Sequence, residues 1–272
     1  MKAPPPATAP EAATPSTTPL LGSLIEDSWT ALRRHTAARI ALGRSGASLP
    51  TREVLAFELA HAQARDAVLT ALDVTALRRA LEADGWVVRE VHSRAPDQAA
   101  YLARPDWGRR LDSDSLSALA ALHIHSTELV LVVSDGLSST AVQQNAAPLL
   151  RALQPLLPDA VTVAPVVVAR HARVALADEV GEMFGARIAV SLIGERPGLS
   201  SPDSLGAYLT YAPRVGRSDA ERNCISNIRP QGLGYDEAAL QLVALIRAAL
   251  HAQLSGVKLQ FDPARAIGGK PQ

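Results

Sequence analysis

The amino-acid sequence predicts an α/β fold. Its main part is a doubly wound, mostly parallel, Rossmann-like sheet, preceded by a small helical N-terminal domain and a disordered Pro/Ala-rich tail. After residue 85 the chain contains short apolar runs, three of them almost continuously apolar and rich in Val and Ile. Strands that are covered on both faces have this composition. Helical patterns separate the runs, and alternating strands and helices build parallel sheets through right-handed crossovers.

Composition narrows the classes of function. The 272 residues include 27 Lys+Arg and 27 Asp+Glu, so the formal net charge is 27 − 27 = 0. Nucleic-acid binding and polybasic membrane binding both need clustered positive charge, so we expect neither partner. No run approaches the roughly 18–20 apolar residues that span a bilayer. The single cysteine, Cys224, cannot form an internal disulfide, which favours a reducing compartment.

The N-terminal part of the chain divides into a tail and a helical domain. Residues 1–20 hold six of the nineteen prolines and are predicted to be disordered. Residues 21–84 form the predicted helical domain, because their apolar residues recur with a helical period. The predicted helices run from Leu24 to a stop at Gly43, from Thr51 to about Leu72, and from Asp73 to a stop at Gly85.

Residues 85–262 form the predicted α/β domain, and residues 263–272 a flexible C-terminus. The expected strands are Trp86–Val91, Leu129–Val133, Val161–Ala169, Ile188–Ile193 and Leu205–Tyr211. The expected helices are Ser115–Leu122, Ser139–Leu153, Ala177–Phe184 and Asp236 to about Leu254. In such a sheet, ligands bind beyond the carboxyl ends of the strands.

Two segments directly after predicted strands are candidates for ligand binding. Ser134–Thr140 opens a helix, and its small residues would let backbone N–H groups approach a polar ligand. The same pattern is also typical of an ordinary turn, with Gly at a positive φ and Ser as the N-cap. Gly194–Leu199 places the Glu195 carboxylate where this architecture binds ligands, although Glu195 could equally pair with an arginine in a solvated loop.

Two further segments are candidates for contact with a ligand or with a partner protein. Arg222–Arg229 surrounds Cys224 with Asn and Ser side chains that could bond ligand amides. No second Cys or nearby His supports a metal or a nucleophile there, and a buried filler is the ordinary role of a lone cysteine. Arg104–Arg110 is a charged loop with one Trp. It could contact an anion or a partner, or simply pair its own Asp and Arg.

Several known signatures are missing from the sequence. There is no GxGxxG after a strand, no Walker loop, no GxSxG and no HExxH. The residues alone therefore predict an α/β ligand-binding protein without an obvious catalytic set.

Long stretches of the chain resemble one family. They are ARPDWGRRL (103–111), VVSDGLSSTA (132–141), VGEMFGARIAVSLIGERPGL (180–199), SLGAYLTYAPR (204–214), ERNCISNIRPQG (221–232) and a closing helix ending in LSGVKL. In this order they closely resemble the small (light) subunit of ethanolamine ammonia-lyase, over roughly residues 25–260.

This resemblance implies a function. In that family the small subunit is not catalytic by itself, and it packs on a large subunit whose barrel holds the substrate. Adenosylcobalamin sits between the two subunits, and the enzyme converts ethanolamine to acetaldehyde and ammonia by a radical mechanism. The family positions that contact the cofactor match Val174, Glu195 and Cys224, and each surrounding motif is intact.

The resemblance also predicts what this chain does not supply. We expect no catalytic residue and no metal ligand from it. Cobalamin modules that provide a histidine ligand to cobalt carry a DxHxxG signature, which this chain lacks. We therefore expect the cofactor to keep its own benzimidazole as the lower ligand.

Two alternatives and one question of location stay open. The chain could be a stand-alone α/β module for a nucleotide or another small ligand, or a scaffold that stabilises a partner without touching ligand. Some relatives carry an amphipathic N-terminal helix that targets a bacterial microcompartment. Residues 1–20 are broken by proline. We expect a cytoplasmic enzyme, with the microcompartment as the alternative location.

Overall fold

The computed structural model describes residues 24–261, so the predicted tail (1–20) and the predicted C-terminal segment (263–272) lie outside the described residues. The chain forms two compact units, one ending at Glu58 and the other beginning at Leu59. This division falls within helix α1 (Thr51–Leu69). The predicted domain boundary at residues 84 and 85 stays a prediction, and it lies between helix α2 (Val74–Ala83) and strand β3 (Val88–His92).

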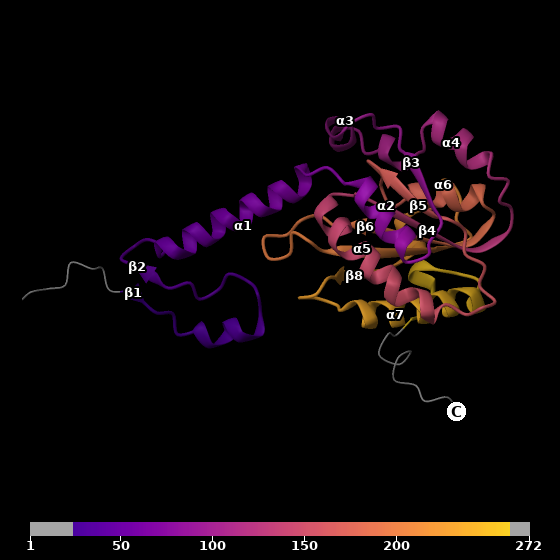
Figure 1. Cartoon of the computed structure of the whole chain (residues 1–272). Helices are drawn as coiled ribbons and strands as arrows, with labels where there is room; N and C mark the ends of the chain where they lie inside the picture. The colour runs from indigo at the N-terminus through magenta and orange to yellow at the C-terminus, as the bar shows by residue number, and fades with distance from the viewer. Residues whose placement is uncertain (1–23, 262–272) are drawn as a thin grey trace, which may run out of the picture. The chain divides into compact units, whose positions relative to one another are not determined.

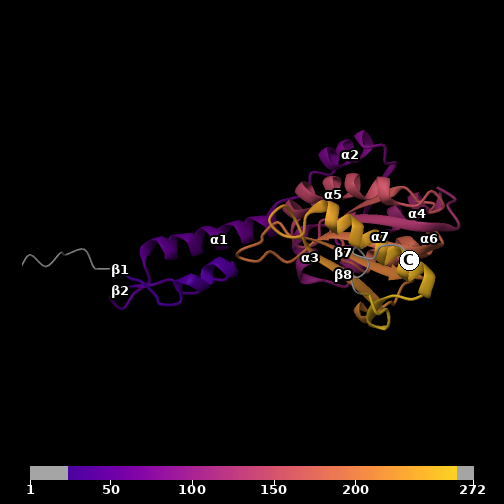
Figure 2. The same cartoon turned by 90° about the horizontal axis from the view of Figure 1, so that it is seen from below.

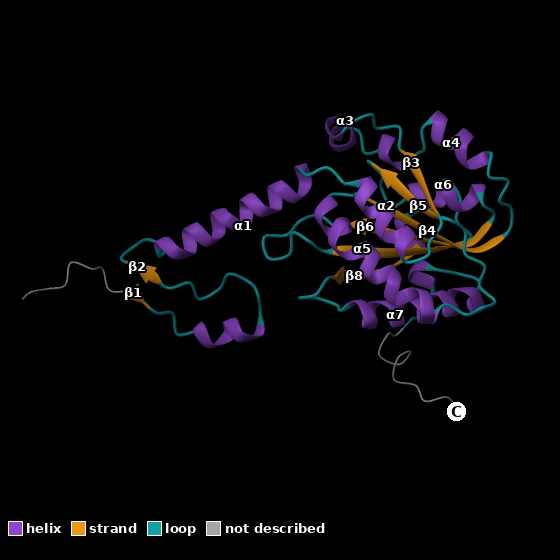
Figure 3. Ribbon diagram, viewed as in Figure 1, coloured by secondary structure: helices purple, strands orange, loops and turns teal. Residues whose placement is uncertain are grey.

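The larger unit is built on one six-stranded sheet with the order β3-β5-β4-β6-β7-β8 (Figures 1 and 3). Strands β3, β5, β4 and β6 are parallel, whereas β7 is antiparallel to both β6 and β8. The bounds are β3 Val88–His92, β4 Thr127–Ser134, β5 Val166–Arg170, β6 Ala186–Gly194, β7 Leu205–Tyr211 and β8 Arg222–Ile228. The prediction of an α/β fold with a mostly parallel sheet is confirmed.

Helices cover both faces of this sheet (Figure 2). One hydrophobic cluster joins the sheet to α2 (Val74–Ala83), α5 (Ser139–Leu153) and α7 (Tyr235–Ala252). A second cluster joins the opposite face to α4 (Ser113–Ala120) and α6 (Leu176–Met183). Along β4, Leu131 belongs to the first cluster and Val132 to the second, as the two-residue period of a strand requires. Complete burial of each such side chain contributes about 1.5–3 kcal/mol.

Short polar side chains cap the N-termini of several of these helices. Ser138 caps α5 by accepting a hydrogen bond from the Ala141 N–H at 3.1 Å. Asp112 caps α4 through the Ser115 N–H at 2.7 Å. Each cap satisfies an N–H group that the first helical turn leaves without a partner. Helix α5 has the bounds that the sequence predicts, and α4, α6 and α7 differ from theirs by only a few residues at the ends.

The predicted helix from Leu24 to Gly43 is wrong. In its place the chain has strand β1 (Leu24–Ile25), a 3₁₀ helix (Thr30–His35) and strand β2 (Arg44–Ser45), which pairs antiparallel with β1. The 3₁₀ helix buries no residue, and Trp29 just before it is 66% exposed. A helix is stabilised mainly by burying its apolar face, and the described residues of this unit offer that face no core.

Two strand predictions also need correction. The run Val161–Ala169 is not one strand: β5 begins only at Val166, because Pro165 cannot donate to the ladder, and Val163 makes a single bridge to Leu129. Strand β8 was not predicted at all. Its polar sequence RNCISNI lacks an apolar run, and a register irregularity against β7 interrupts the alternation.

No helix among residues 24–261 is both long and apolar enough to cross a membrane.

The ends of β4 and β6 approach each other closely. The Leu137 N–H donates to the Gly194 carbonyl at 3.0 Å, just after β4 ends. Gly136 has a φ of +59°, and a Cβ there would lie 2.3 Å from the Gly194 oxygen. A Cβ on Gly194 would lie 2.1 Å from the Ser138 carbonyl oxygen. Neither position has room for a side chain, so this contact depends on two glycines.

We predict that Gly194→Ala destabilises the chain by at least about 2 kcal/mol, because the added methyl group meets backbone atoms that cannot turn away. The measurement is the urea midpoint of the purified chain. Gly234→Ala is the matched control, since Gly234 has a φ of −63° and a Cβ there would meet no atom within 4 Å. Equal midpoints for the two variants would contradict the packing described above.

Candidate functional site

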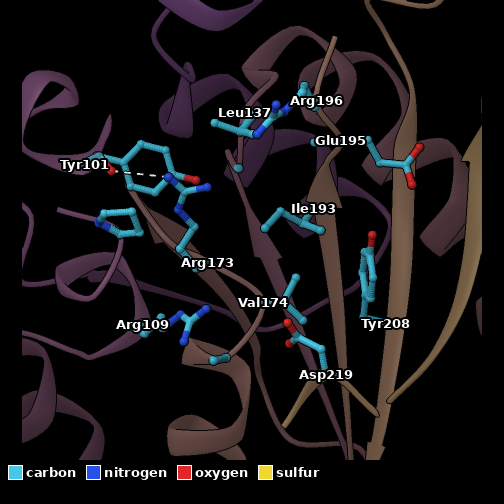
Figure 4. A pocket seen from close by; sticks show the side chains of 14 residues that line it. Tyr101, Arg109, Leu137, Arg173, Val174, Ile193, Glu195, Arg196, Tyr208 and Asp219 are labelled. Carbon is cyan, nitrogen blue, oxygen red and sulfur yellow. Dashed lines mark hydrogen bonds between the residues drawn. The ribbon is translucent and has the colours of Figure 1, made fainter. Parts of the chain in front are cut away.

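A cavity of about 230 Å³ lies at the carboxyl ends of β4 and β6 (Figure 4). Helix α5 follows β4 on one face of the sheet, and α6 follows the neighbouring strand β5 on the other, so the crossovers change direction between these two strands, beside the cavity. Open α/β sheets bind ligands at such a point. The cavity is lined by Tyr101, Pro105, Arg109, Gly136, Leu137, Arg173, Val174, Ala175, Ile193, Gly194, Glu195, Arg196, Tyr208 and Asp219.

Val174 lines this cavity from the loop after β5, and a buried carboxylate holds that loop. Asp135 accepts hydrogen bonds from the N–H groups of His171 (2.7 Å), Ala172 (3.0 Å) and Gly136 (3.0 Å). Burial raises the pKa of Asp135, and the three backbone donors oppose this effect. The Asp135 carboxyl therefore ties the end of β4 to the segment that carries Val174.

Glu195 lines the same cavity from the end of β6, and its carboxylate is already held by the protein. It accepts hydrogen bonds from the hydroxyls of Ser204 and Ser226 and, at 3.3 Å, from the Asn227 N–H. Gly206 lies beneath it, where a Cβ would be 2.9 Å from Glu195 Oε1. The interpretation that Glu195 simply pairs with an arginine is wrong, because its partners are hydroxyls and a backbone amide.

Cys224 lies beside the cavity rather than in its lining. It is exposed on β8 and pairs across the strands with Tyr208, which does line the cavity. Desolvation raises the pKa of the Cys224 thiol, and the charge of Glu195 adds to this effect. A protonated thiol at neutral pH does not favour a nucleophilic role. The structure thus brings Val174 and Glu195 into one cavity and places Cys224 next to it.

The segment Ser134–Thr140 is mainly a structural turn. The Ser138 hydroxyl caps α5 and also donates to the Pro202 carbonyl at 2.7 Å, which ties a second loop to this helix end. Only Gly136 and Leu137 of this segment line the cavity. The ordinary-turn interpretation explains most of the motif, and the remaining two residues contribute to the cavity wall.

Two of the three arginines in the loop Arg104–Arg110 pair with carboxylates, and the third does not. Arg104 pairs with Asp106 at 2.7 Å and lies over the Trp107 ring. Arg110 pairs at 2.7 Å with Glu179, whose carboxylate also accepts the Leu111 N–H. Arg109 makes no such pair within the described part of the chain, and it lines the cavity. The self-pairing interpretation is therefore correct for Arg104 and Asp106.

Sequence reasoning missed Tyr101, Arg173, Tyr208 and Asp219, which also line the cavity. Tyr101 is fully buried in the short helix α3 (Gln98–Ala103), outside every predicted element. Arg173 precedes Val174 and lies over the Tyr101 ring, 4.3 Å from its centre. Tyr208 could have been noticed because aromatic residues are scarce in this chain and it lies in a predicted strand. No local pattern points to Asp219.

Comparison with known proteins gives the family. The family model described as ethanolamine ammonia-lyase light chain matches residues 26–260. The chain belongs to this family. Among similar proteins, the ethanolamine ammonia-lyase small subunit of Ralstonia nicotianae is 54% identical over 242 residues, covering 88% of this chain and 90% of that protein.

Two further relatives agree. The ethanolamine ammonia-lyase small subunit of Bradyrhizobium diazoefficiens is 54% identical, covering 86% of this chain and 90% of the relative. That of Rhodopseudomonas palustris is 56% identical, covering 85% and 89%. The resemblance stated from the sequence motifs is thus confirmed, and the chain is a small subunit in a family of lyases.

We predict that Asp135→Asn loosens the loop that carries Val174. The amide turns an N–H₂ group toward backbone N–H donors, so at least one donor loses its acceptor, at a cost of about 1–3 kcal/mol. Hydrogen exchange of the His171 and Ala172 amides should become faster than in the unsubstituted small subunit. Asp159→Asn, at an exposed position, is the control. Unchanged protection of both amides would rule out this anchoring role.

Proposed function

We propose that this chain forms one wall of the adenosylcobalamin site of ethanolamine ammonia-lyase, at its contact with the large subunit. The observation that carries the proposal is the convergence of Val174 and Glu195, from two different loops, on one cavity at the point where the crossovers change direction. Cys224 is proposed to contact the cofactor from the adjoining strand. When bound, adenosylcobalamin supplies the radical that the conversion of ethanolamine to acetaldehyde and ammonia requires.

The donors and acceptors of the cavity fit this cofactor. Cobalamin is a large ring edged with amides, so it needs acceptors for amide N–H groups. Glu195 supplies such an acceptor. Val174 and Ile193 supply apolar contact surface for the ring. The Arg173 Nε is buried without a hydrogen-bond partner among the described residues, which supports an acceptor outside this chain.

The size of the cavity supports a shared site. Its volume of about 230 Å³ lies below the roughly 300–1,000 Å³ of pockets that enclose drug-sized ligands. A corrin ring is larger than such ligands, so this chain can enclose only part of it. The rest of the cofactor needs a second wall, and we assign that wall to the large subunit. This favours the subunit role over a stand-alone ligand-binding module.

Glu195 is proposed to bind the cofactor through the part of its carboxylate that the protein leaves open. A carboxylate accepts about four hydrogen bonds. Three come from Ser204, Ser226 and Asn227, which hold the group in one orientation. The remaining acceptor site suits one amide N–H of the corrin edge. A preoriented acceptor loses less side-chain entropy on binding than a free one.

Glu195→Ala in the assembled enzyme should weaken adenosylcobalamin binding by about 10- to 150-fold, because a charge-assisted hydrogen bond is worth roughly 1.5–3 kcal/mol. The measurement is the dissociation constant of the cofactor, titrated on the purified complex with the large subunit. Ser226→Ala removes one donor that orients Glu195 and should weaken binding to a smaller extent. Glu237→Ala, at an exposed position of α7, is the matched control.

An unchanged dissociation constant for Glu195→Ala would exclude this residue as a cofactor contact. It would also favour a scaffold that stabilises the large subunit without touching ligand. The same titration on the chain without its partner tests the stand-alone alternative: tight binding by the isolated, folded chain would favour that module. Under our proposal, tight binding requires both subunits.

The cofactor is expected to keep its own benzimidazole as the lower ligand of cobalt. No histidine is among the residues that line the cavity described here. We predict that labelling this chain with ¹⁵N-histidine leaves the nitrogen hyperfine splitting of the reduced cofactor unchanged in electron paramagnetic resonance of the assembled enzyme. A change in the splitting would show a protein imidazole on cobalt and refute the prediction.

A further inference from the structure

Three arginines that line the cavity take no part in the ion pairs formed among the described residues. They are Arg109 from the loop after α3, Arg173 from the loop after β5, and Arg196 from the loop after β6. Within residues 24–261, none of the three forms an ion pair with an acidic side chain. Their neighbour Arg110 does, through Glu179. Arg109 acts only at longer range on Asp106, whose carboxylate is paired with Arg104. Loops from three separate segments therefore bring positive charge without a direct ion pair to one cavity.

Arg173 is held in place by contacts that leave its charge available. Its guanidinium lies 4.3 Å from the centre of the Tyr101 ring and donates to the Tyr101 carbonyl at 3.3 Å. Its backbone N–H donates to the Gly108 carbonyl at 2.7 Å. A Cβ on Gly108 would lie 2.9 Å from Arg173 Cγ, so the two loops pack tightly together. A guanidinium fixed in this way loses little freedom when it binds an anion.

The two acidic residues of the cavity do not cancel this charge. In Figure 4, Arg109 and Arg173 lie on one side of Val174 and Ile193, and Glu195 lies on the other. The Glu195 carboxylate is held by three donors, the Ser204 and Ser226 hydroxyls and the Asn227 N–H, and not by an arginine. Asp219 is turned to solvent, with its side chain 86% exposed, and it lies 3.3 Å from Arg222. The arginine side of the cavity therefore presents positive charge that neither of these two carboxylates pairs with.

We infer that this arginine side is a subsite that binds the phosphodiester of the cofactor's nucleotide arm, an assignment that rests on the proposed function. Adenosylcobalamin carries one anionic group, the phosphodiester, on a framework whose edges are neutral amides. The planar fork of arginine matches phosphate oxygens with paired hydrogen bonds. A cavity of about 230 Å³ has room for a phosphodiester and its sugar, though not for the corrin. Glu195 and the arginine subsite therefore serve different parts of one ligand.

Two probes that differ only in phosphate test this inference on the assembled enzyme. They are adenosylcobinamide, which ends in a hydroxyl group, and adenosylcobinamide phosphate. Arg109→Gln and Arg196→Gln should each weaken binding of the phosphate-bearing probe by about 10- to 150-fold, the range for one charge-assisted hydrogen bond. Binding of adenosylcobinamide should stay within about twofold. The readout is the dissociation constant, so turnover is not needed.

The controls separate the possible outcomes. Arg247→Gln, at an exposed site on α7, should change binding of neither probe. Equal weakening of both probes by the cavity variants would overturn the assignment, since the arginines would then contact the corrin. No effect on either probe, with weaker subunit association, would also overturn it and would assign the arginines to the large subunit.

The inference and the proposed function can fail separately. Glu195→Ala should weaken both probes, because its proposed contact is with the corrin edge that they share. If adenosylcobalamin itself does not bind the unsubstituted complex, the cofactor proposal is wrong. If both bind and only the arginine variants fail to discriminate between them, the cofactor proposal survives and the phosphate assignment falls.

Discussion

The carboxylate of Asp135 is the interaction on which the cavity depends. It accepts three backbone N–H groups and so joins the end of β4 to the loop after β5. Burial works against its charge, as the raised pKa shows, and the three donors compensate for that cost. Arg173 and Val174 follow directly in the chain. Their positions at the cavity are consequences of where this one carboxylate holds the backbone.

The close approach of β4 and β6 positions the other residues that line the cavity. With Gly136 and Gly194 in contact, the first residues beyond both strands meet at one point. Glu195 follows Gly194 immediately and is oriented by donors from β7 and β8 segments. The antiparallel edge of the sheet therefore positions a carboxylate, while the parallel centre positions arginines and apolar side chains. This division is the basis of the proposed site, in which the carboxylate serves an amide-edged ring and the arginines serve an anionic group.

Local sequence patterns predicted the helices and strands that are specified by residues adjacent in the sequence. Helix α5 was placed correctly because Ser138 is a strong N-cap and the following residues keep a helical period. The central strands were recognised because burial on both faces demands continuous apolar residues. The predicted helix at Leu24 failed for the converse reason: its apolar residues have no core to cover among the described residues. Strand β8 was missed because hydrogen bonds to β7, and not its own composition, make it a strand.

The sequence by itself determined the α/β class, the helix N-caps and the family. It also determined the candidate cofactor contacts, which are Val174, Glu195 and Cys224. Each of these follows from neighbours along the chain or from long matching motifs. Only the tertiary structure decided that Val174 and Glu195 share one cavity while Cys224 stands beside it on β8. It also decided that, across residues 24–261, Arg109 has no carboxylate partner when Arg104 and Arg110 are paired. Charge pairing is a matter of distances across the fold, and residues 69 positions apart, such as Arg110 and Glu179, give no local sign of it.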